Sequence, residues 1–481
     1  MSELSSAYWQ NFEKTREGLR KKITQDQWRL KYHLMPETGW MNDPNGLVQF
    51  NGTYHIYHQY VPDDPKGGLV HWGHKTSDDL VHFKEEDLFL SPDRVFDKSG
   101  VYSGSAFVKD DEIHFFYTGN VKHPGDHEYT FSGREQNTVH VVSKDGFTVD
   151  YREVCIPHED YPQGFTNHIR DPKVFEKNGK YYMILGARAL NNRGKILIYT
   201  SKDLYNWVYS GIFLEGEKEM GYMWECPDFF ETPQKDVLLF SPQGLKATEY
   251  SYSNTHQTGY YLGKVDWNKG GFIPDTPFEE LDKGFDFYAP QTFEDESGRR
   301  ILFAWMGLGD TDPEYSNPTV PRGWQHALTL PRELTVVNGK LKQSPLIEYQ
   351  KLRTNKVTAN IDLKETFELK AENQDTFELL VEVEKLNSSF TIHIKEDTTL
   401  TYKNNLFTLK HGVSGYGRSS RSVEIETLDK VHLFGDTSSI EIFLNDGEYV
   451  LTSRVYPKKL RQSILFEGNG SLGVTFWNLE L

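Results

Sequence analysis

The stretch Ile198-Tyr199-Thr200-Ser201-Lys202-Asp203-Leu204 decides the fold of this chain. Its apolar run ends in Ser-Lys-Asp, a combination that favours a turn after a strand. The same pattern recurs at residues 74–80, His-Lys-Thr-Ser-Asp-Asp-Leu, and at residues 139–145, Val-His-Val-Val-Ser-Lys-Asp. A strand and turn that recur along a chain indicate a repeat architecture.

Each copy belongs to a longer unit that starts at a Pro or Gly and continues through a strand rich in Tyr and Phe. The five starts are Asp43-Pro44, Ser103-Gly104, Asp171-Pro172, Pro227-Asp228 and Ala289-Pro290. Each unit has about 60 residues, which is room for four strands. Five such units in a ring form a five-bladed β-propeller and remove most exposed strand edges, whereas a long array of β-sandwiches fits the regular repeat less well. In a propeller the five starts converge on one end of the central channel.

The regions outside the repeats differ from them. Residues 1–31 are charged and amphipathic, which predicts a short helical extension. Residues 336–357 include the apolar-polar stretch 346–352, which indicates a linker with a short helix. Residues 358–481 show strands separated by hairpin turns, as in a β-sandwich. We therefore expect an all-β fold, with a five-bladed β-propeller catalytic domain at 32–335 and a supporting C-terminal β-sandwich at 358–481.

Composition limits the partners of the chain. With 481 residues and a formal charge of −17, it is long enough for two domains and unsuited to nucleic acid or an anionic membrane. Two cysteines, Cys155 and Cys226, rule out a disulfide framework. There is no basic-then-apolar signal segment and no apolar run of ~18 residues. We expect a cytoplasmic monomer or weak homo-oligomer that acts on a small molecule.

Three repeats have an acidic residue at their entry, namely Asp43 in the first, Asp171 in the third and Glu225, just before Pro227, in the fourth. Carboxylates that converge in one funnel repel one another, so the ionisation of at least one is disfavoured. A retaining glycoside hydrolase uses such groups, because one carboxylate attacks and another acid protonates the leaving oxygen. A metal site is the competing interpretation, but His71 and His74 would face opposite sides of a strand. We therefore expect neither a metal nor another cofactor.

Three motifs carry a resemblance to a known family. Trp40-Met41-Asn42-Asp43-Pro44-Asn45-Gly46, Arg170-Asp171-Pro172 and Glu225-Cys226-Pro227, in this order, resemble glycoside hydrolase family 32, the invertases, fructanases and sucrose-6-phosphate hydrolases. The resemblance covers about residues 32–334 and, more weakly, the C-terminal region through residues 439–447. It implies a five-bladed propeller joined to a β-sandwich, which agrees with the repeat count.

The resemblance implies a role for each acid. Asp43 matches the nucleophile that attacks C2 of a fructosyl unit, Glu225 the general acid that later activates water, and Asp171 the residue that holds fructosyl hydroxyls. From their neighbours we expect Asp171, beside Arg170, to stay ionised and Glu225, among apolar groups, to stay protonated. The substrate-binding candidates are Trp40, Met41, Asn42, Gln59, Tyr102, Ser103, Arg170, Asp286 and Trp305.

The choice of substrate depends on finer features. Many relatives that cleave fructans or sucrose carry a Trp between the positions of Gln59 and Trp72, where this chain has residues 64–68, Asp-Pro-Lys-Gly-Gly. The absent signal segment and the stretches 240–245 and 323–330 resemble the intracellular bacterial members that act on sucrose 6-phosphate. A phosphate would need local positive charge. The candidates are Lys66, Arg134, Arg188, Arg193 and Lys246.

Parts of the pattern also fit other functions. A carbohydrate-binding propeller without activity would keep the aromatic residues but would not need three acids. An arabinan- or xylan-cleaving five-bladed enzyme has a similar set of acids but lacks the context of residues 40–46. Within the family, a cytosolic hydrolase of sucrose or short fructans and a fructosyltransferase are the alternatives.

Overall fold

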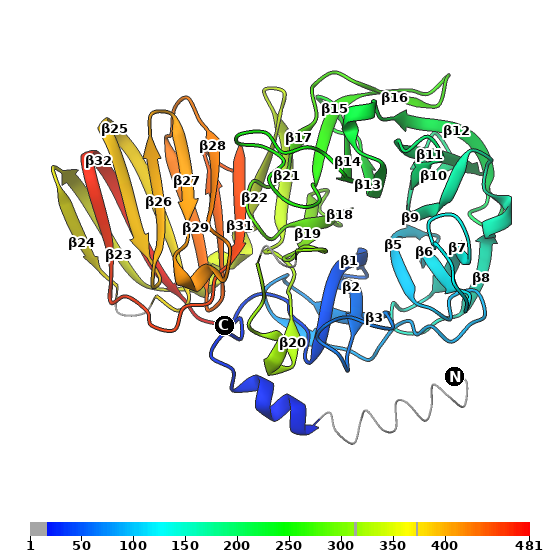
Figure 1. Cartoon of the computed structure of the whole chain (residues 1–481), viewed down its shortest axis with the longest axis horizontal. Helices are drawn as coiled ribbons and strands as arrows, with labels where there is room; N and C mark the ends of the chain where they lie inside the picture. Colours follow the sequence, from blue (N-terminus) through cyan, green and yellow to red (C-terminus); the bar gives the residue numbers. More distant parts are fainter. Residues whose placement is uncertain (1–16, 312–314, 372–373) are drawn as a thin grey trace.

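The computed structural model describes residues 17–311, 315–371 and 374–481. Five sheets surround a central channel, and a sixth, C-terminal sheet lies to one side of them (Figure 1). This arrangement confirms the five-bladed β-propeller and the C-terminal sandwich. A helix at residues 17–24 confirms a short N-terminal helix, while residues 1–16 of the expected extension lie outside the described part.

Each blade is an antiparallel sheet whose strands follow one another from the channel outward. Blade one contains β1 (Gly39–Phe50), β2 (Thr53–Val61), β3 (His71–Ser77) and β4 (Phe83–Glu85), and blade two β5 (Val101–Lys109), β6 (Glu112–Lys122), β7 (Arg134–Ser143) and β8 (Tyr151–Ile156). Blade three contains β9 (Phe165–Lys177), β10 (Lys180–Ala189), β11 (Gly194–Ser201) and β12 (Val208–Glu215). Blade four contains β13 (Met223–Phe230), β14 (Asp236–Gln243), β15 (Gly259–Asp266), β16 (Gly271–Pro274) and β17 (Glu279–Glu280). Blade five contains β18 (Tyr288–Glu294), β19 (Arg300–Trp305), β21 (Arg332–Val337) and β22 (Lys340–Pro345), while β20 (Trp324–Gln325) pairs in parallel with β1.

The recurring sequence pattern forms the same turn in three blades. Ser201 Oγ accepts hydrogen bonds from the backbone N–H groups of Asp203 (3.2 Å) and Leu204 (3.0 Å). The turns at 77–80 and 143–146 repeat the bond from the fourth residue to the serine Oγ, at 2.9 Å in both. The fourth residue is left-handed each time, with φ of 68° at Leu204, 59° at residue 80 and 78° at residue 146. The repeat is therefore a repeated hydrogen-bonded turn between the third and fourth strands.

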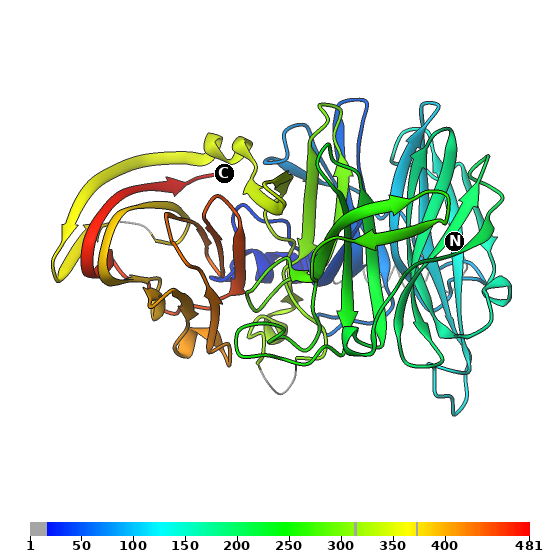
Figure 2. The same cartoon turned by 90° about the horizontal axis from the view of Figure 1, so that it is seen from above.

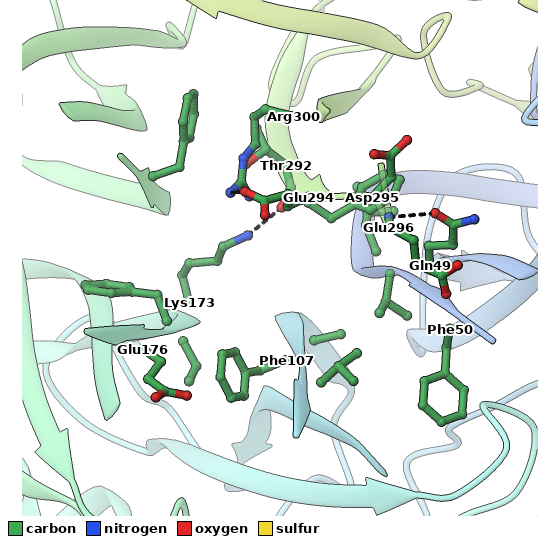
Figure 3. Close-up of a pocket in the computed structure, with 18 of the residues that line it drawn as sticks. Gln49, Phe50, Phe107, Lys173, Glu176, Thr292, Glu294, Asp295, Glu296 and Arg300 are labelled. Atoms are coloured by element: carbon green, nitrogen blue, oxygen red, sulfur yellow. Dashed lines mark hydrogen bonds and ion pairs between the residues drawn. The ribbon is translucent and has the colours of Figure 1, made fainter. Parts of the chain in front are cut away.

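The inner strands β1, β5, β9, β13 and β18 line the channel, and their later residues surround a cavity of about 770 Å³ at one end. Figure 3 shows Lys173 in this cavity, directed toward Thr292. Lys173 Nζ donates to the backbone oxygen of Thr292 (2.5 Å) and to Asp228 Oδ2 (3.1 Å), and Arg300 Nη2 lies 3.1 Å from Glu294. The two basic side chains of this cavity are therefore already paired.

Hydrogen bonds between inner strands close the middle of the channel. Gln291 on β18 donates to the backbone oxygen of Gly104 on β5, which belongs to a blade that is not adjacent to its own. Ser105 Oγ donates to the backbone oxygen of Pro172 (2.8 Å), and Gly104 N donates to Asn45 Oδ1 (3.1 Å). We call this layer the waist, and it separates the far cavity from the opposite mouth.

The C-terminal sheet folds back on itself into a sandwich (Figure 2). Its strands are β23 (Arg353–Leu363), β24 (Thr366–Lys370), β25 (Phe377–Ile394), β26 (Thr398–Lys403), β27 (Leu406–Lys410), β28 (Ser420–Glu424), β29 (Lys430–Asp436), β30 (Ser439–Leu444), β31 (Tyr449–Arg454) and β32 (Ser463–Leu479). The 18-residue β25 pairs with β29 through its first part and with β26 through its last part, so it bends across both layers. An apolar cluster that includes Phe377, Ile392 and Phe466 fills the space between them.

Short 3₁₀ helices complete the structure: η1 (His158–Asp160), η2 (Lys218–Met220), η3 (Val320–Arg322), η4 (Ile347–Leu352) and η5 (Val413–Gly415). The range 336–357, expected to be a linker, contains η4 but also β22, which is the outer strand of blade five. The propeller and sandwich meet across buried charges, because Arg332 on β21 lies 2.6 Å from Glu441 on β30. Within the described ranges, no helix is long and apolar enough to cross a membrane.

Candidate active site

A pocket of about 240 Å³ opens at the mouth of the channel opposite the far cavity. It lies at the start of the same five inner strands. Its lining residues are Asn42, Asp43, Gln59, Tyr102, Ser103, Arg134, Arg170, Asp171, Glu225, Cys226, Gln243, His256, Tyr288, Trp305, Gly309 and Asp310. The structure thus brings together the three acids that the repeat starts had singled out.

The backbone of three inner strands adopts a strained conformation at this mouth. Asp171 (φ 63°), Cys226 (φ 47°) and Ala289 (φ 48°) are left-handed, and each stands directly before a proline. The register with the next strand shifts after Glu225 and after Tyr288. A left-handed residue other than glycine costs roughly 1–2 kcal/mol, so tertiary contacts hold these kinks in place. The kinks coincide with the part of each strand that lines the pocket.

Asp43 is held by neutral donors. Its Oδ2 accepts a hydrogen bond from Ser103 Oγ (2.5 Å) and lies 3.5 Å from Gln59 Nε2, and its Oδ1 accepts one from Asn42 Nδ2 (3.1 Å). Burial raises the pKa of Asp43 to about 6, although the Ser103 hydrogen bond favours the ionised form. The carboxyl therefore ionises in the weakly acidic range.

Asp171 and Asp43 share one neighbour, Cys226. The backbone N–H of Cys226 donates to Asp171 Oδ2 (2.9 Å), and its Sγ lies 3.7 Å from one oxygen of each acid. Burial raises the pKa of Asp171 to about 7, the charge of Arg170 opposes this rise, and the charge of Glu225 adds to it. Burial and the nearby acids also raise the pKa of the Cys226 thiol, which stays protonated. The thiol therefore faces both acids as a weak donor.

Glu225 has the strongest polar partners of the three acids. Arg170 donates to its Oε1 through Nε (3.1 Å) and Nη2 (2.5 Å), while Gln243 (2.7 Å) and the hydroxyl of Tyr288 (2.5 Å) donate to its Oε2. Burial alone would raise the pKa of Glu225, but Arg170 and these hydrogen bonds lower it below its ordinary value.

The expected protonation states are therefore reversed in this structure. Arg170 was expected to keep Asp171 ionised, yet its Nε lies 3.9 Å from Asp171 and 3.1 Å from Glu225. Side chains of consecutive residues diverge, so the long Arg170 side chain reaches the neighbouring blade. Glu225 consequently has a lowered pKa and Asp171 a raised one.

Most of the other residues predicted to bind substrate line the pocket, but Trp40 and Met41 do not. Those that line the pocket are Asn42, Gln59, Tyr102, Ser103, Arg170 and Trp305. Trp40 packs beside the pocket, with its ring 5.8 Å from Trp305 and its Nε1 donating to Asn42 (2.8 Å). Met41 points to the other side of β1 and is completely buried in an apolar cluster, so it does not fit a substrate contact.

Asp286 also lies outside the pocket. Its carboxylate receives Nε and Nη2 of Arg418, both at 2.7 Å, and the backbone N–H of Arg454 (2.8 Å). Both arginines belong to the C-terminal region, and Asp286 is 1% exposed. This position corrects the expectation from the sequence: Asp286 joins the two domains and is not available to a ligand.

The five basic residues that were candidates for phosphate binding lie in different places, and one of them lines the pocket. Arg134 lines the pocket, and Arg188 lies over the ring of Tyr222 at 4.7 Å. Arg193 lies 3.8 Å from Glu215. Lys66 and Lys246 are exposed and are not among the lining residues.

Six lining residues were not predicted as site residues: Cys226, Gln243, His256, Tyr288, Gly309 and Asp310. Gln243 falls in the stretch 240–245 that the family resemblance marks, and Tyr288 directly precedes the start of the fifth repeat at Ala289, so a role for both was within reach of the sequence. His256 Nε2 lies 3.1 Å from Asp310 Oδ2, and both stand in loops without a recurring pattern. No local feature of the sequence distinguishes this pair.

Comparisons with known proteins agree with this site and fold. The N-terminal domain of glycosyl hydrolases family 32 matches residues 33–345, and the C-terminal domain of that family matches residues 348–480. The chain is 40% identical over 464 residues to a sucrose-6-phosphate hydrolase of Bacillus subtilis, an alignment that covers 94% of this chain and 95% of the relative.

Two solved structures are similar over almost the whole length. A sucrose-6-phosphate hydrolase from Lactobacillus gasseri matches with a TM-score of 0.87 and 29% identity, covering 97% of this chain and 96% of that one. A mutant β-fructofuranosidase of family 32 from Bombyx mori, in complex with sucrose, matches with a TM-score of 0.85 and 29% identity, covering 100% and 99% of the two chains. The chain thus belongs to glycosyl hydrolases family 32.

Proposed function

We propose that this protein is a cytoplasmic β-fructofuranosidase that hydrolyses sucrose 6-phosphate to glucose 6-phosphate and fructose. The observation that carries the proposal is the convergence of Asp43, Asp171 and Glu225 in one pocket at the channel mouth. The 40% identity to a sucrose-6-phosphate hydrolase supports the choice of substrate. The cytoplasmic location belongs to the proposal because a phosphorylated sugar is retained inside the cell.

The proposed reaction is a double displacement with retention. The Asp43 carboxylate attacks C2 of the fructosyl unit while the C2–O glycosidic bond breaks and Glu225 gives its proton to the leaving oxygen. Glu225 then takes a proton from water, the water oxygen bonds to C2, and the ester bond to Asp43 breaks. Asp171 holds fructosyl hydroxyls, and such contacts supply several kcal/mol when they strengthen in the transition state.

The contacts of the acids fit these roles with one constraint. Asp43 accepts only neutral hydrogen bonds, so its carboxylate is not neutralised by a counterion. Glu225, however, is held as an anion by Arg170, whereas the first step needs it protonated. We therefore expect activity to fall as the pH rises, since Glu225 then loses the proton that the leaving oxygen requires.

The test is release of fructose from sucrose 6-phosphate and from sucrose, side by side, with the Asp43→Asn variant as the blank. A preference of tenfold or more for the phosphorylated sugar, worth ~1.4 kcal/mol, supports the proposal. Equal rates would identify a hydrolase of unphosphorylated sucrose, an alternative that the similarity to a fructofuranosidase in complex with sucrose favours. No release from either sugar overturns the proposed substrates.

A further inference from the structure

Basic side chains gather around His168 at the edge of the pocket. Burial and, after it, the charges of Arg170, Arg134, Arg188 and Lys122 lower the pKa of the His168 imidazole to about 2. These four cations come from blades two and three, in a chain whose formal charge is −17. A concentration of positive charge on an acidic protein marks a place for a negatively charged group.

Hydrogen-bond chemistry shows that an acceptor is missing between two of these residues. Arg170 Nη1 contacts His168 Nδ1, and because a guanidinium can only donate, Nδ1 accepts. A neutral imidazole then carries its proton on Nε2, which lies 3.5 Å from Arg134 Nη1. Arg134 also can only donate. Two donors therefore face each other, and an oxygen with several lone pairs would satisfy both.

Arg134 adds a third donor to this place. Its Nε is buried and has no hydrogen-bond partner among the described residues. An unpaired buried donor costs about 1–3 kcal/mol, so an arrangement that retains it points to a ligand. Burial, more than any neighbour, lowers the pKa of the guanidinium, but it stays charged at neutral pH.

The cations around His168 are held by rings and amides. Arg134 lies over the ring of Tyr129 at 5.8 Å, Lys122 over the same ring at 5.5 Å, and Arg188 donates to Asn192 Oδ1 at 2.9 Å. In the described part of the chain, none of these three has a carboxylate within 4.0 Å. Their charge is thus fixed in position but not neutralised.

We propose that His168, Arg134 and Arg188 form an oxyanion subsite, with Lys122 at its outer side, that binds the phosphate of the leaving sugar. This inference rests on the proposed function and assigns its phosphate specificity to particular residues. Arg170 fixes the location, because it donates to Glu225 through Nε and Nη2 and contacts His168 through Nη1. The subsite therefore lies one guanidinium away from the acid that protonates the leaving oxygen.

The experiment compares Arg134→Gln, Arg188→Gln and the double variant with the wild type. We measure kcat and KM for sucrose 6-phosphate and for sucrose, together with competitive inhibition by inorganic phosphate. We expect the ratio of kcat/KM for the two sugars to fall tenfold or more in each single variant, chiefly through KM, and the inhibition constant for phosphate to rise. Arg94→Gln is the matched control, because Arg94 is a surface arginine beside Asp93 outside the pocket, and it leaves the ratio unchanged.

The outcomes separate the subsite from the function. A wild type without preference for the phosphorylated sugar overturns the proposed function. A wild type that has the preference, and variants that keep it, overturn the subsite alone. Equal losses for both sugars also overturn it, since the arginines would then serve the pocket as a whole. If Arg134→Gln does not fold, Arg188→Gln gives the same comparison.

Discussion

Arg170 binds Glu225 in the neighbouring blade through two nitrogens, Nε at 3.1 Å and Nη2 at 2.5 Å. Both nitrogens donate to the same oxygen, Oε1, and such charge-assisted hydrogen bonds are about twice as strong as neutral ones. It fixes the orientation of Glu225 and also favours its ionised form. The same arginine thus positions the proposed acid and limits the pH range in which that acid holds a proton.

Replacing Arg170 should change the pH dependence of the reaction. In Arg170→Gln the attraction that lowers the pKa of Glu225 is lost, so this pKa rises. Because the pKa of Glu225 lies below that of Asp43, Glu225 sets the acid limb of kcat/KM for sucrose, and we expect this limb to move to higher pH in the variant. A pH–rate profile of the variant beside the wild type measures this shift, and a limb that stays in place contradicts the assignment of Glu225 as the acid.

The proposed nucleophile, Asp43, and the proposed acid, Glu225, can be distinguished by changing the leaving group. With sucrose, Asp43→Asn and Glu225→Gln should each lose ~10³-fold or more in turnover. With β-fructofuranosyl fluoride, Glu225→Gln should still release a burst of fluoride, because fluoride leaves without needing a proton from an acid. Asp43→Asn should show no burst, since no covalent intermediate forms. A burst in Asp43→Asn, or none in Glu225→Gln, would reverse or remove these roles.

The alkaline limb of the profile should report Asp43. Burial raises the pKa of Asp43 to about 6, above the lowered pKa of Glu225, so the form with Asp43 ionised and Glu225 protonated declines as the pH rises through about 6, and kcat/KM should fall there. Ser103→Ala removes a hydrogen bond that favours the carboxylate, which should move the limb to higher pH. Ser105→Ala is the control. Ser105 lies two residues after Ser103 on β5 and donates to the backbone oxygen of Pro172. An equal shift in both variants would count against Asp43.

The pair Asp286–Arg418 should matter for stability. Both side chains are buried, so Arg418→Met leaves an unpaired anion and should lower the free energy of unfolding by ~3–5 kcal/mol. The double variant Asp286→Asn, Arg418→Met should recover part of this loss. Denaturant unfolding followed by tryptophan fluorescence measures both. If Asp286→Asn instead raised KM and left stability unchanged, Asp286 would be a substrate contact after all.

The parts of the fold that were predictable depend on local chemistry. The turn at Ser201–Leu204 is closed by its own side chains, so its pattern survives in three blades and reveals the repeat. The proline that follows Asp171 marks the kink of an inner strand in the same way. By contrast, the bend of β25 depends on pairing with both β26 and β29, which no short stretch of sequence records.

Prediction of the site succeeded and failed for the same reason: local patterns are visible in the sequence, and contacts between distant segments are not. The positions of Asp43, Asp171 and Glu225 at repeat starts brought them to one mouth, and the structure places them there. The partner of Arg170 was misjudged because sequence proximity favoured Asp171, whereas the side chain reaches 55 residues further along the chain. Asp286 was misjudged because Arg418 lies 132 residues away. An ion pair between segments far apart in the sequence produces no recurring pattern from which it could be predicted.

The waist lies between the two cavities and closes the channel, so the pocket has a single opening. Gln291 reaches across the channel to Gly104, so nothing threads from one mouth to the other. A polymer therefore cannot pass through the channel beyond Asp43, and whatever enters the pocket also leaves through the same mouth. In the proposed reaction this single opening also sets the order of departure: the leaving sugar goes first, and the fructosyl unit that Asp43 attacks goes last.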